Sequence, residues 1–190
     1  LVLEDELTLG PATIAARGRL ERHSEFGLLA MPGASVLVRP LAALTLRASY
    51  GMGYKAPPAF SKLVSFCPDQ GLFEVIQNPD LRPERSLGGN LSAEYRLADL
   101  SLSAGLFRND IDGMIADSLV SRDTVTGVWR YQHFNRGAVV TQGVELGAAV
   151  RFLRAFSLRT GYSLTDTRDV NAGAVLPYRP THSANMTLAW

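Results

Sequence analysis

The sequence predicts an all-β fold, an antiparallel up-and-down meander of about nine strands, and two observations support this. Apolar residues alternate with polar or very small ones in segment after segment, which is typical of strands with one apolar and one wet face. The connections between these segments alternate between short and long along the chain. A meander of this kind gathers the short turns at one end and the long loops at the other, as in bacterial outer-membrane barrels.

The alternation is clearest in residues 44–54, where Leu44, Leu46, Ala48, Tyr50, Met52 and Tyr54 oppose Thr45, Arg47, Ser49, Gly51 and Gly53. Similar patterns occupy 87–97, 100–106, 144–152, 156–165 and 182–190, with weaker ones at 12–21 and 34–40. Residues 1–7 fit the tail of a first strand, and the stretches near 99–119 and 127–151 are expected to be unusually long strands. Tight connections are predicted from Leu7 to Pro11, Arg39 to Ala43, Leu97 to Asp99 and Phe152 to Ala155, and longer ones at 22–33, 55–83, 120–127 and 168–180.

The length of these segments suits a membrane-spanning barrel. Eleven residues at a rise of about 3.3 Å make roughly 35 Å of strand. Tilted by about 40°, such a strand covers roughly 26 Å, close to the apolar band of about 25 Å in these barrels. The wet faces carry Gly and Ser beside Arg and Glu, as expected for a wide lumen. A soluble β-sandwich is the alternative, because its strands also alternate.

Composition excludes several other classes. The 190 residues include 19 Lys+Arg and 18 Asp+Glu, so there is no basic excess of the kind that nucleic-acid-binding proteins usually show. The longest apolar runs fall far short of the roughly 18 residues of a transmembrane helix. A single cysteine, Cys67, precludes an internal disulfide framework or a Cys-based zinc site. The three histidines lie on different segments without metal-ligand spacing, and no catalytic set is indicated.

Four stretches contain residues with a possible functional or structural role. The loop 55–83 is long enough to be functional, and its Phe and Lys residues suit an aromatic, anionic ligand, with loop–loop packing as the alternative. The stiff segment 78–84 is expected to lead into the next strand. The segment 107–115 superficially resembles a calcium loop but lacks its spacing, so its charges are expected on a strand. In 142–147, Glu145 is placed on the wet face between two glycines.

In order and spacing, these motifs resemble the barrel of TonB-dependent outer-membrane receptors. The resemblance covers essentially the whole chain and is carried by Leu44–Gly51 leading to Tyr54–Pro57, then by 78–84, 107–110 and 142–145. Residues 161–170, with Leu176–Pro177 and His182–Asn185, are most similar to the catecholate siderophore and colicin I receptor branch. Because Leu1 is not a Met and the alternation is still running at Trp190, residues 1–190 are expected to be a C-terminal portion of the barrel without the plug domain.

The resemblance implies a barrel of about 22 strands that must be plugged, in the outer membrane of a Gram-negative bacterium. It implies import of a ferric siderophore, with catecholates favoured, driven by the inner-membrane TonB complex. Expected partners are outer-membrane lipid, the chain's own N-terminal plug, the TonB complex and the siderophore; no enzyme activity, cofactor, metal site or nucleic-acid partner is expected. Passive outer-membrane pores and receptors for cobalamin or haem are the alternatives. The loop residues expected to meet ligand are Tyr54, Phe66, Phe73, Trp129, Arg130 and Tyr131, and the wet-face residues expected to brace the plug are Arg47, Glu94, Glu145 and Arg159.

Overall fold

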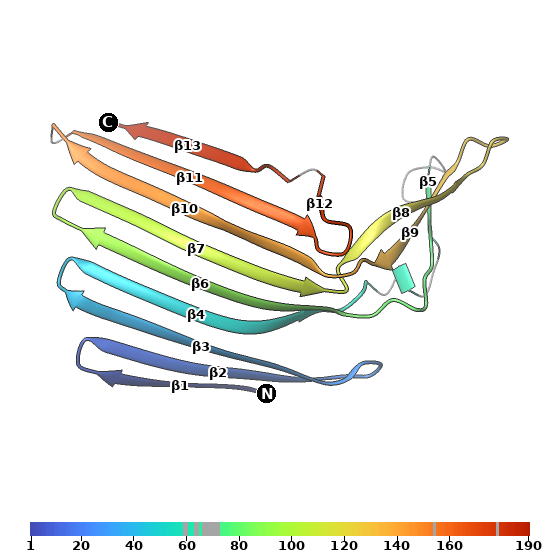
Figure 1. Ribbon diagram of the computed structural model, residues 1–190, viewed down its shortest axis with the longest axis horizontal. Helices are drawn as coiled ribbons and strands as arrows, with labels where there is room; N and C mark the ends of the chain where they lie inside the picture. The colour runs from blue at the N-terminus through green and yellow to red at the C-terminus, as the bar shows by residue number, and fades with distance from the viewer. Residues whose placement is uncertain (59–60, 63–64, 66–72, 154, 178) are drawn as a thin grey trace.

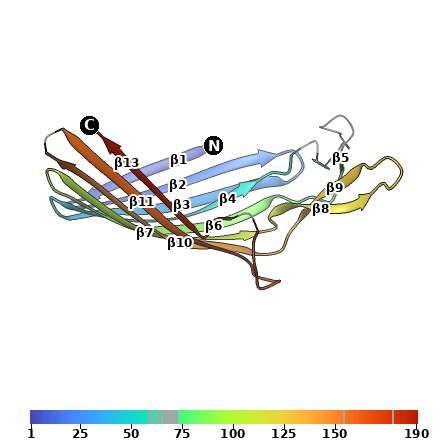
Figure 2. The same cartoon turned by 90° about the horizontal axis from the view of Figure 1, so that it is seen from above.

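A computed structural model describes residues 1–58, 61–62, 65, 73–153, 155–177 and 179–190. Most of the described chain forms one antiparallel sheet of ten strands, bowed into an open arc (Figures 1 and 2). Its order, β1-β2-β3-β4-β6-β7-β10-β11, follows the chain, and β12 and β13 both pair with β11. The up-and-down meander is therefore confirmed. No helix among the described residues is long and apolar enough to span a membrane.

The long strands of the large sheet have 12 to 15 residues, consistent with the extended alternation in the sequence. The strands of this sheet are β1 (Val2–Leu9), β2 (Ala12–His23), β3 (Gly27–Leu41), β4 (Leu44–Lys55), β6 (Glu84–Arg96), β7 (Leu100–Asp112), β10 (Val139–Phe152), β11 (Phe156–Asp169), β12 (Ala174–Val175) and β13 (His182–Ala189).

The four predicted tight turns all lie at one end of the sheet, on the left in Figure 1. The turn between β1 and β2 depends on Gly10, whose φ of 58° lies in the left-handed region that favours glycine. At the opposite end, the predicted long link at 22–33 is wrong: β2 and β3 stay paired as far as His23 and Gly27, which leaves residues 24–26 as the connection. Pro32 lies inside β3, but it remains paired with Gly18.

The two unusually long strands predicted near 99–119 and 127–151 are each divided in two. β7 ends at Asp112, and Gly113, with φ 65°, turns the chain out of the wall into β8 (Ile115–Arg122). The chain returns along β9 (Trp129–Asn135) and re-enters the wall at Val139. The alternation is clear at 100–106 and 144–152 but does not continue through either break, where Gly113 and the stretch 136–138 interrupt it.

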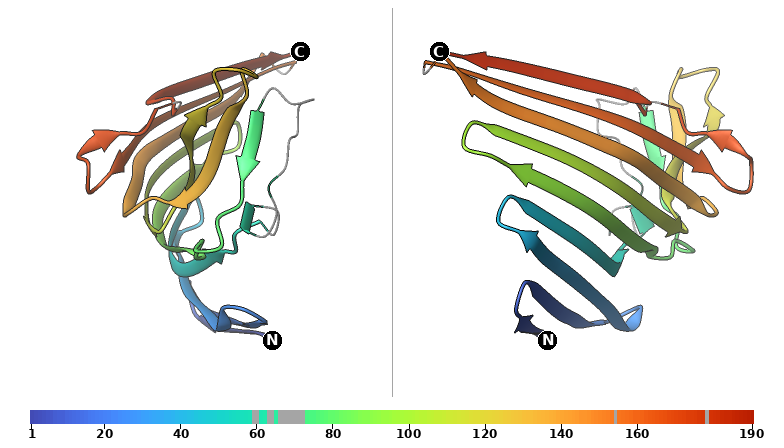
Figure 3. Two further views of the ribbon diagram at one scale, coloured as in Figure 1. Left: turned by 90° about the vertical axis from the view of Figure 1, so that its right-hand side faces the viewer. Right: turned by 60° about the vertical axis from the view of Figure 1, so that its left-hand side comes forward.

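β8 and β9 belong to a second, smaller sheet in the order β5-β9-β8. β5 (Phe73–Ile76) comes from the long loop 55–83 and pairs in parallel with β9, with Phe73 opposite Trp129. Two loops far apart in sequence are thereby joined into one element, here named the loop sheet. Viewed from the loop end, β5 lies on the concave side of the arc (Figure 3, left).

The two faces of the large sheet differ sharply in what they expose. The apolar rows stay open: Leu91, Leu106 and Leu146 are 58%, 54% and 49% exposed. No second layer of described residues covers them, which excludes the β-sandwich. The few buried apolar side chains of the described residues lie at the loop end, where Leu29 and Val139 belong to the polar rows. The loop sheet therefore lies on the polar, concave side, whereas the segment with β12 projects from the convex side (Figure 3, left).

Candidate ligand-binding loops and barrel wall

Four of the six residues predicted to meet ligand lie in the loop sheet, and they are divided between its two faces. Side chains alternate along each strand, so the parallel register of β5 and β9 puts Phe73, Trp129 and Tyr131 on one face and Arg130 on the other. The rings of Phe73 and Tyr131 meet edge to face, with their centroids 6.1 Å apart. Three of the predicted aromatic residues thus form one surface, here named the aromatic face.

A cation that the sequence analysis did not single out completes the aromatic face. Arg122, at the end of β8, is directly opposite Trp129, and its guanidinium carbon lies 4.6 Å from the centre of the Trp129 ring. A guanidinium over an indole is a favourable cation–π arrangement, and it leaves the N–H groups at the guanidinium edge able to meet an anion. The signal in the sequence was weak, because the pairing needs the hairpin register.

Arg130 is engaged on the opposite face. Its Nε lies 2.9 Å from a carboxylate oxygen of Glu74 on β5, and its Nη2 lies 3.9 Å from Asp123. These contacts join β5, β9 and the hairpin tip. Lys62, the cation noted in the long loop, is engaged as well: it pairs with Glu25, donates to the Leu81 carbonyl at 3.0 Å and lies over the Phe26 ring. Both cations hold loops to one another.

The two loops are further joined at their bases by side-chain amides. Asn135 accepts from the Arg82 backbone N–H at 2.8 Å and donates to the carbonyls of Arg82 and Gly113 at 2.8 and 2.7 Å. Asn78 donates to the His133 carbonyl at 2.8 Å. Leu81 is 1% exposed between them. The segment 78–84 is thus a fixed lead-in to β6, in agreement with its two prolines.

The tip of the β8–β9 hairpin is organised by one carboxylate. Asp123 accepts hydrogen bonds from the backbone N–H groups of Thr126 and Val125, at 3.0 and 2.8 Å. These donors favour the charged form, led by the Thr126 N–H, and they hold the pKa of Asp123 below its ordinary value. Gly127 closes the turn with φ 76°.

The remaining predicted loop residues are separate from the aromatic face. Tyr54, at the loop end of β4, donates its hydroxyl to Glu21 of β2 at 2.8 Å, which ties it to the wall. Phe66 and Cys67 lie outside the described residues.

The predicted wet-face residues occupy the polar face of the large sheet. Arg47 and Glu94 lie on neighbouring strands with 3.5 Å between nitrogen and oxygen, and Arg96 makes a second pair with Glu94 at 2.6 Å. Glu145 projects beside Gly105 and is exposed, as is Arg159 on β11. No group of three potential metal ligands occurs among the described residues.

This arrangement is a single-layer wall with its loop sheet on the polar, concave side. A family model described as "TonB dependent receptor-like, beta-barrel" matches residues 1–190. The chain belongs to this family. The resemblance seen in the sequence motifs is therefore confirmed across the whole chain.

Individual curated proteins align over essentially the whole chain. The ferric enterobactin receptor PirA of Pseudomonas aeruginosa is 28% identical over 204 residues, which cover 100% of this chain and 28% of PirA. An iron-regulated outer membrane virulence protein of Vibrio cholerae is 25% identical over 203 residues, covering 99% of this chain and 30% of that protein. This chain therefore spans less than a third of the length of these curated relatives.

Solved structures agree on the fold. The crystal structure of the siderophore receptor PirA from P. aeruginosa superposes with a TM-score of 0.83 and 25% identity, covering 100% of this chain and 36% of that one. A variant of the ferric enterobactin receptor PfeA from the same organism gives a TM-score of 0.80 at 21% identity, covering 100% and 29%. At that identity the PfeA match speaks for the fold alone.

Proposed function

We propose that this chain forms part of the barrel wall and the ligand-capturing loops of an outer-membrane receptor for ferric siderophores, with catecholates favoured. The family supports a receptor barrel, and the relatives named as ferric enterobactin receptors support the ligand class. In this proposal the apolar rows meet membrane lipid, the polar rows face the interior, and the loop sheet lies on the outside of the cell.

The observation that carries the ligand class is the aromatic face of the loop sheet. A ferric catecholate complex is anionic and presents aromatic rings. Phe73, Trp129 and Tyr131 offer ring surfaces, and Arg122 adds a positive charge against Trp129. Stacking and cation–π contacts of this kind reward a ligand that is both aromatic and negatively charged.

The wet-face charges have a place in the same proposal. Arg47 and Glu94 are already paired within the wall, whereas Glu145 and Arg159 stand exposed on the concave face. We assign Glu145 and Arg159 to contacts with a plug domain inside the barrel, and Arg47 and Glu94 to the wall beside it. A plug that moves when the TonB complex pulls it would exchange such charged contacts without breaking a packed apolar core.

The proposal is tested by uptake and by binding. Deletion of the complete gene in iron-starved cells should abolish uptake of radiolabelled ferric enterobactin through this receptor, and the plasmid-borne gene should restore it.

In the purified complete gene product, Trp129→Ala should weaken binding of ferric enterobactin about threefold to tenfold, the range expected for loss of one aromatic contact. The matched control is Val125→Ala, because Val125 lies at the tip of the same hairpin and is 93% exposed. Unchanged uptake after deletion contradicts the proposal.

A further inference from the structure

A hollow of about 430 Å³ lies on the polar face of the wall at its turn end, the end that carries the four tight turns. β7, β10 and β11 line it with polar-row residues and with the backbone between them. Arg96 of β6, Ser101 of β7 and Arg159 of β11 lie in one row of the register, and Arg151 of β10 lies in the next row toward the turns. This feature is here named the turn-end hollow.

Three arginines border the turn-end hollow from three different strands. Neighbouring strands are about 4.8 Å apart, so the Cα atoms of Arg96 and Arg159 lie about 14 Å from each other across β7 and β10. The residues between them in the row are Ser101 and Ala149, which are too short to separate two long side chains. Because this face of the wall is concave, long side chains on it lean toward a common centre (Figure 3, left). The three guanidinium groups can therefore reach one anion between them.

Two of these arginines have charge to offer. No described residue forms an ion pair or a hydrogen bond with the side chain of Arg159, which is exposed. The ion pair of Arg151 is long, with 3.7 Å between its Nε and a carboxylate oxygen of Asp99, and 72% of the Arg151 side chain is exposed. An anion can therefore bind at Arg151 and Arg159 without displacing a close ion pair.

The turn end of the polar face carries more positive than negative charge. Glu94 serves two arginines, Arg47 at 3.5 Å and Arg96 at 2.6 Å, so one of their two charges is unmatched. Arg159 adds a second unmatched charge. A concave surface with an excess of one sign attracts ions of the opposite sign. The turn-end hollow is thus suited to an anion.

The rows above the turn-end hollow offer an anion no earlier cation. The next four polar rows toward the loops on β7, β10 and β11 contain no lysine or arginine, and Glu145 is their one charged side chain. Their other members are mostly glycine, serine, threonine and asparagine. An anion that moves along these rows from the loop end meets its first cations on β10 and β11 at Arg151 and Arg159.

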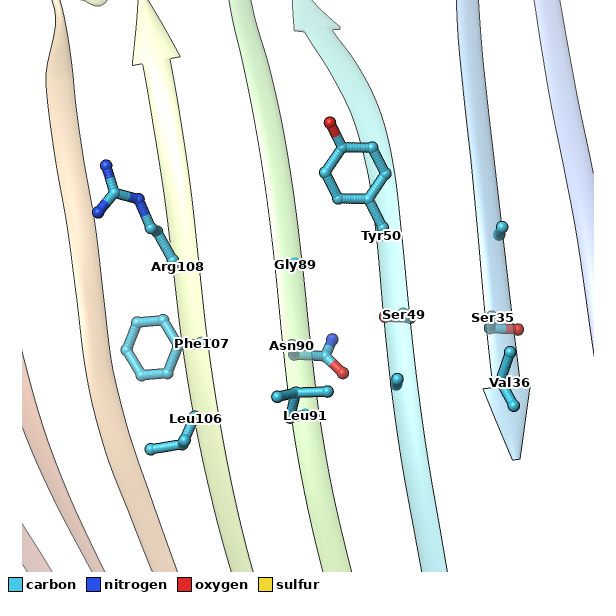
Figure 4. A pocket seen from close by; sticks show the side chains of 12 residues that line it. Ser35, Val36, Ser49, Tyr50, Gly89, Asn90, Leu91, Leu106, Phe107 and Arg108 are labelled. Carbon is cyan, nitrogen blue, oxygen red and sulfur yellow. The ribbon is translucent and has the colours of Figure 1, made fainter. Parts of the chain in front are cut away.

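The turn-end hollow differs from the larger hollow on the apolar face. That hollow measures about 560 Å³, and Tyr50, Leu91 and Leu106 gather in it (Figure 4). In the proposed orientation it faces lipid. The turn-end hollow faces the interior at the inner mouth of the barrel, because the short turns of such barrels lie on the periplasmic side. A hydrated anion inside the barrel therefore reaches the turn-end hollow and not the larger one.

From these observations we infer that the turn-end hollow is a second, exit-side binding site for the anionic ferric catecholate complex, formed by Arg151 and Arg159 with Arg96 at its border. The inference rests on the proposed function. Catecholate oxygens bound to iron are negatively charged, and guanidinium groups give them charge-assisted hydrogen bonds. The volume lies within the range of small-ligand sites, about 300–1,000 Å³. Because the proposed function places Arg159 against the plug at rest, the site opens when the plug is pulled away.

Uptake kinetics test the role of the arginines. In iron-starved cells that make the complete gene product, Arg151→Gln/Arg159→Gln should lower the maximal rate of ferric enterobactin uptake about tenfold, because the complex loses charge-assisted hydrogen bonds on its way out. Its affinity at the cell surface should stay unchanged, because the loop sheet is untouched. The matched control is Arg39→Gln, since Arg39 is an exposed arginine near the turn end of β3 and does not line the hollow.

A maximal rate equal to that of the Arg39→Gln control overturns the inference. If the double variant does not fold, judged by heat-dependent gel mobility, Arg159→Gln and Arg159→Lys carry the comparison singly. Glutamine should then lower the rate and lysine, which keeps the charge, should retain most of it; equal rates for the two overturn the inference.

Photo-cross-linking separates the ligand from the plug as the occupant. Ser157 lines the hollow opposite Arg151, and the photoreactive amino acid p-benzoylphenylalanine replaces it in the complete gene product. During uptake of ferric enterobactin with the radiolabel in the siderophore, position 157 should acquire radioactivity, whereas the same substitution at Arg39 should not. Cells that lack the TonB complex should show no labelling at either position.

A cross-link from position 157 to the chain's own N-terminal segment, with no radioactivity during uptake, overturns the inference and assigns the hollow to the plug alone. The proposed function survives that result, because uptake itself is intact. Absence of ferric enterobactin uptake by the unmodified protein contradicts the proposed function and the inference together, so the two failures are distinguishable.

Discussion

At the scale of single residues, Gly143 shows how closely the wall is fitted. Phe107 lies opposite Gly143 in the register of β7 and β10, on the polar face. A Cβ at Gly143 would lie 2.7 Å from ring atom Cζ of Phe107 and would also meet the Leu164 carbonyl oxygen. The aromatic ring occupies the space that the glycine leaves, which is how aromatic residues stabilise glycines in sheets.

Gly143→Ala should therefore destabilise the folded barrel by about 1–3 kcal/mol, the usual cost of overpacking. Gly105→Ala is the matched control on the neighbouring strand, because its Cβ would meet no atom closer than 3.8 Å. Urea titration of the refolded complete gene product, followed by tryptophan fluorescence, measures both. Equal unfolding free energies for the two variants would show that neither the Phe107 ring nor the Leu164 carbonyl opposes the added methyl group.

Asp123 makes a prediction about pH at the hairpin tip. The Thr126 and Val125 N–H groups lower its pKa, so the folded turn binds its proton more weakly than the open turn does. Linkage then gives a turn that is fully held at neutral pH and loosens as the pH falls below 3.8, the ordinary pKa of an aspartate, through the lowered value. Amide exchange at Val125 and Thr126 should accelerate over that fall relative to Asp123→Asn, whose side chain does not titrate. If amide exchange had the same pH profile in both proteins, the negative charge of Asp123 would not be what stabilises the turn.

At the scale of elements, the loop sheet joins two loops into one body. Asn135 makes three hydrogen bonds between β9, the segment before β6 and Gly113, where the chain leaves the wall. The parallel pairing of β5 with β9 and the Glu74–Arg130 contact add to this. Under the proposed function, the two loops would meet a ligand as one body.

Asn135→Ala should separate the two loops without unfolding the wall. Proteolysis within residues 55–83 should become at least about tenfold faster, because the three lost hydrogen bonds contribute about 0.5–1.5 kcal/mol each. Ser118→Ala, an exposed polar position on β8, is the control. The heat-dependent gel mobility of the barrel should remain as before, and an unchanged cleavage rate would mean that the backbone pairing of β5 and β9 alone holds the loops.

The loop sheet could not be predicted from the sequence, although most strands of the wall could. Alternation identified β4, β6, β7, β10 and β11 and assigned their faces, because a period of two is a local property of the chain. Nothing local tells Phe73 to pair with Trp129, and that parallel pairing depends on where two loops meet above the wall. Gly113 interrupts the alternation, but a glycine alone does not tell whether a strand bends, bulges or ends, and its φ of 65° marks the break between β7 and β8. Arg122 was missed for the same reason, because its contact with Trp129 needs the hairpin register.

At the scale of the whole molecule, the wall reverses the usual distribution of apolar residues. Among the described residues, many large aliphatic side chains in the middle of the sheet stay exposed, and the buried ones lie at the loop end. Contiguous exposed apolar surface of this extent is unfavourable in water. The arrangement is stable where hydrocarbon replaces water on that face and the polar rows line an interior.

Site-directed spin labelling tests this central claim most directly. In the complete gene product with Cys67 replaced by serine, labels are attached at Leu91 and at its neighbour Ser92 on β6, and at Leu106 and its neighbour Gly105 on β7. In lipid bilayers, labels at 91 and 106 should collide more with dissolved oxygen than with a water-soluble nickel chelate, because oxygen concentrates in hydrocarbon. Labels at 92 and 105 should show no such preference. Equal or reversed preferences between the neighbours would contradict the assignment of the apolar rows to lipid.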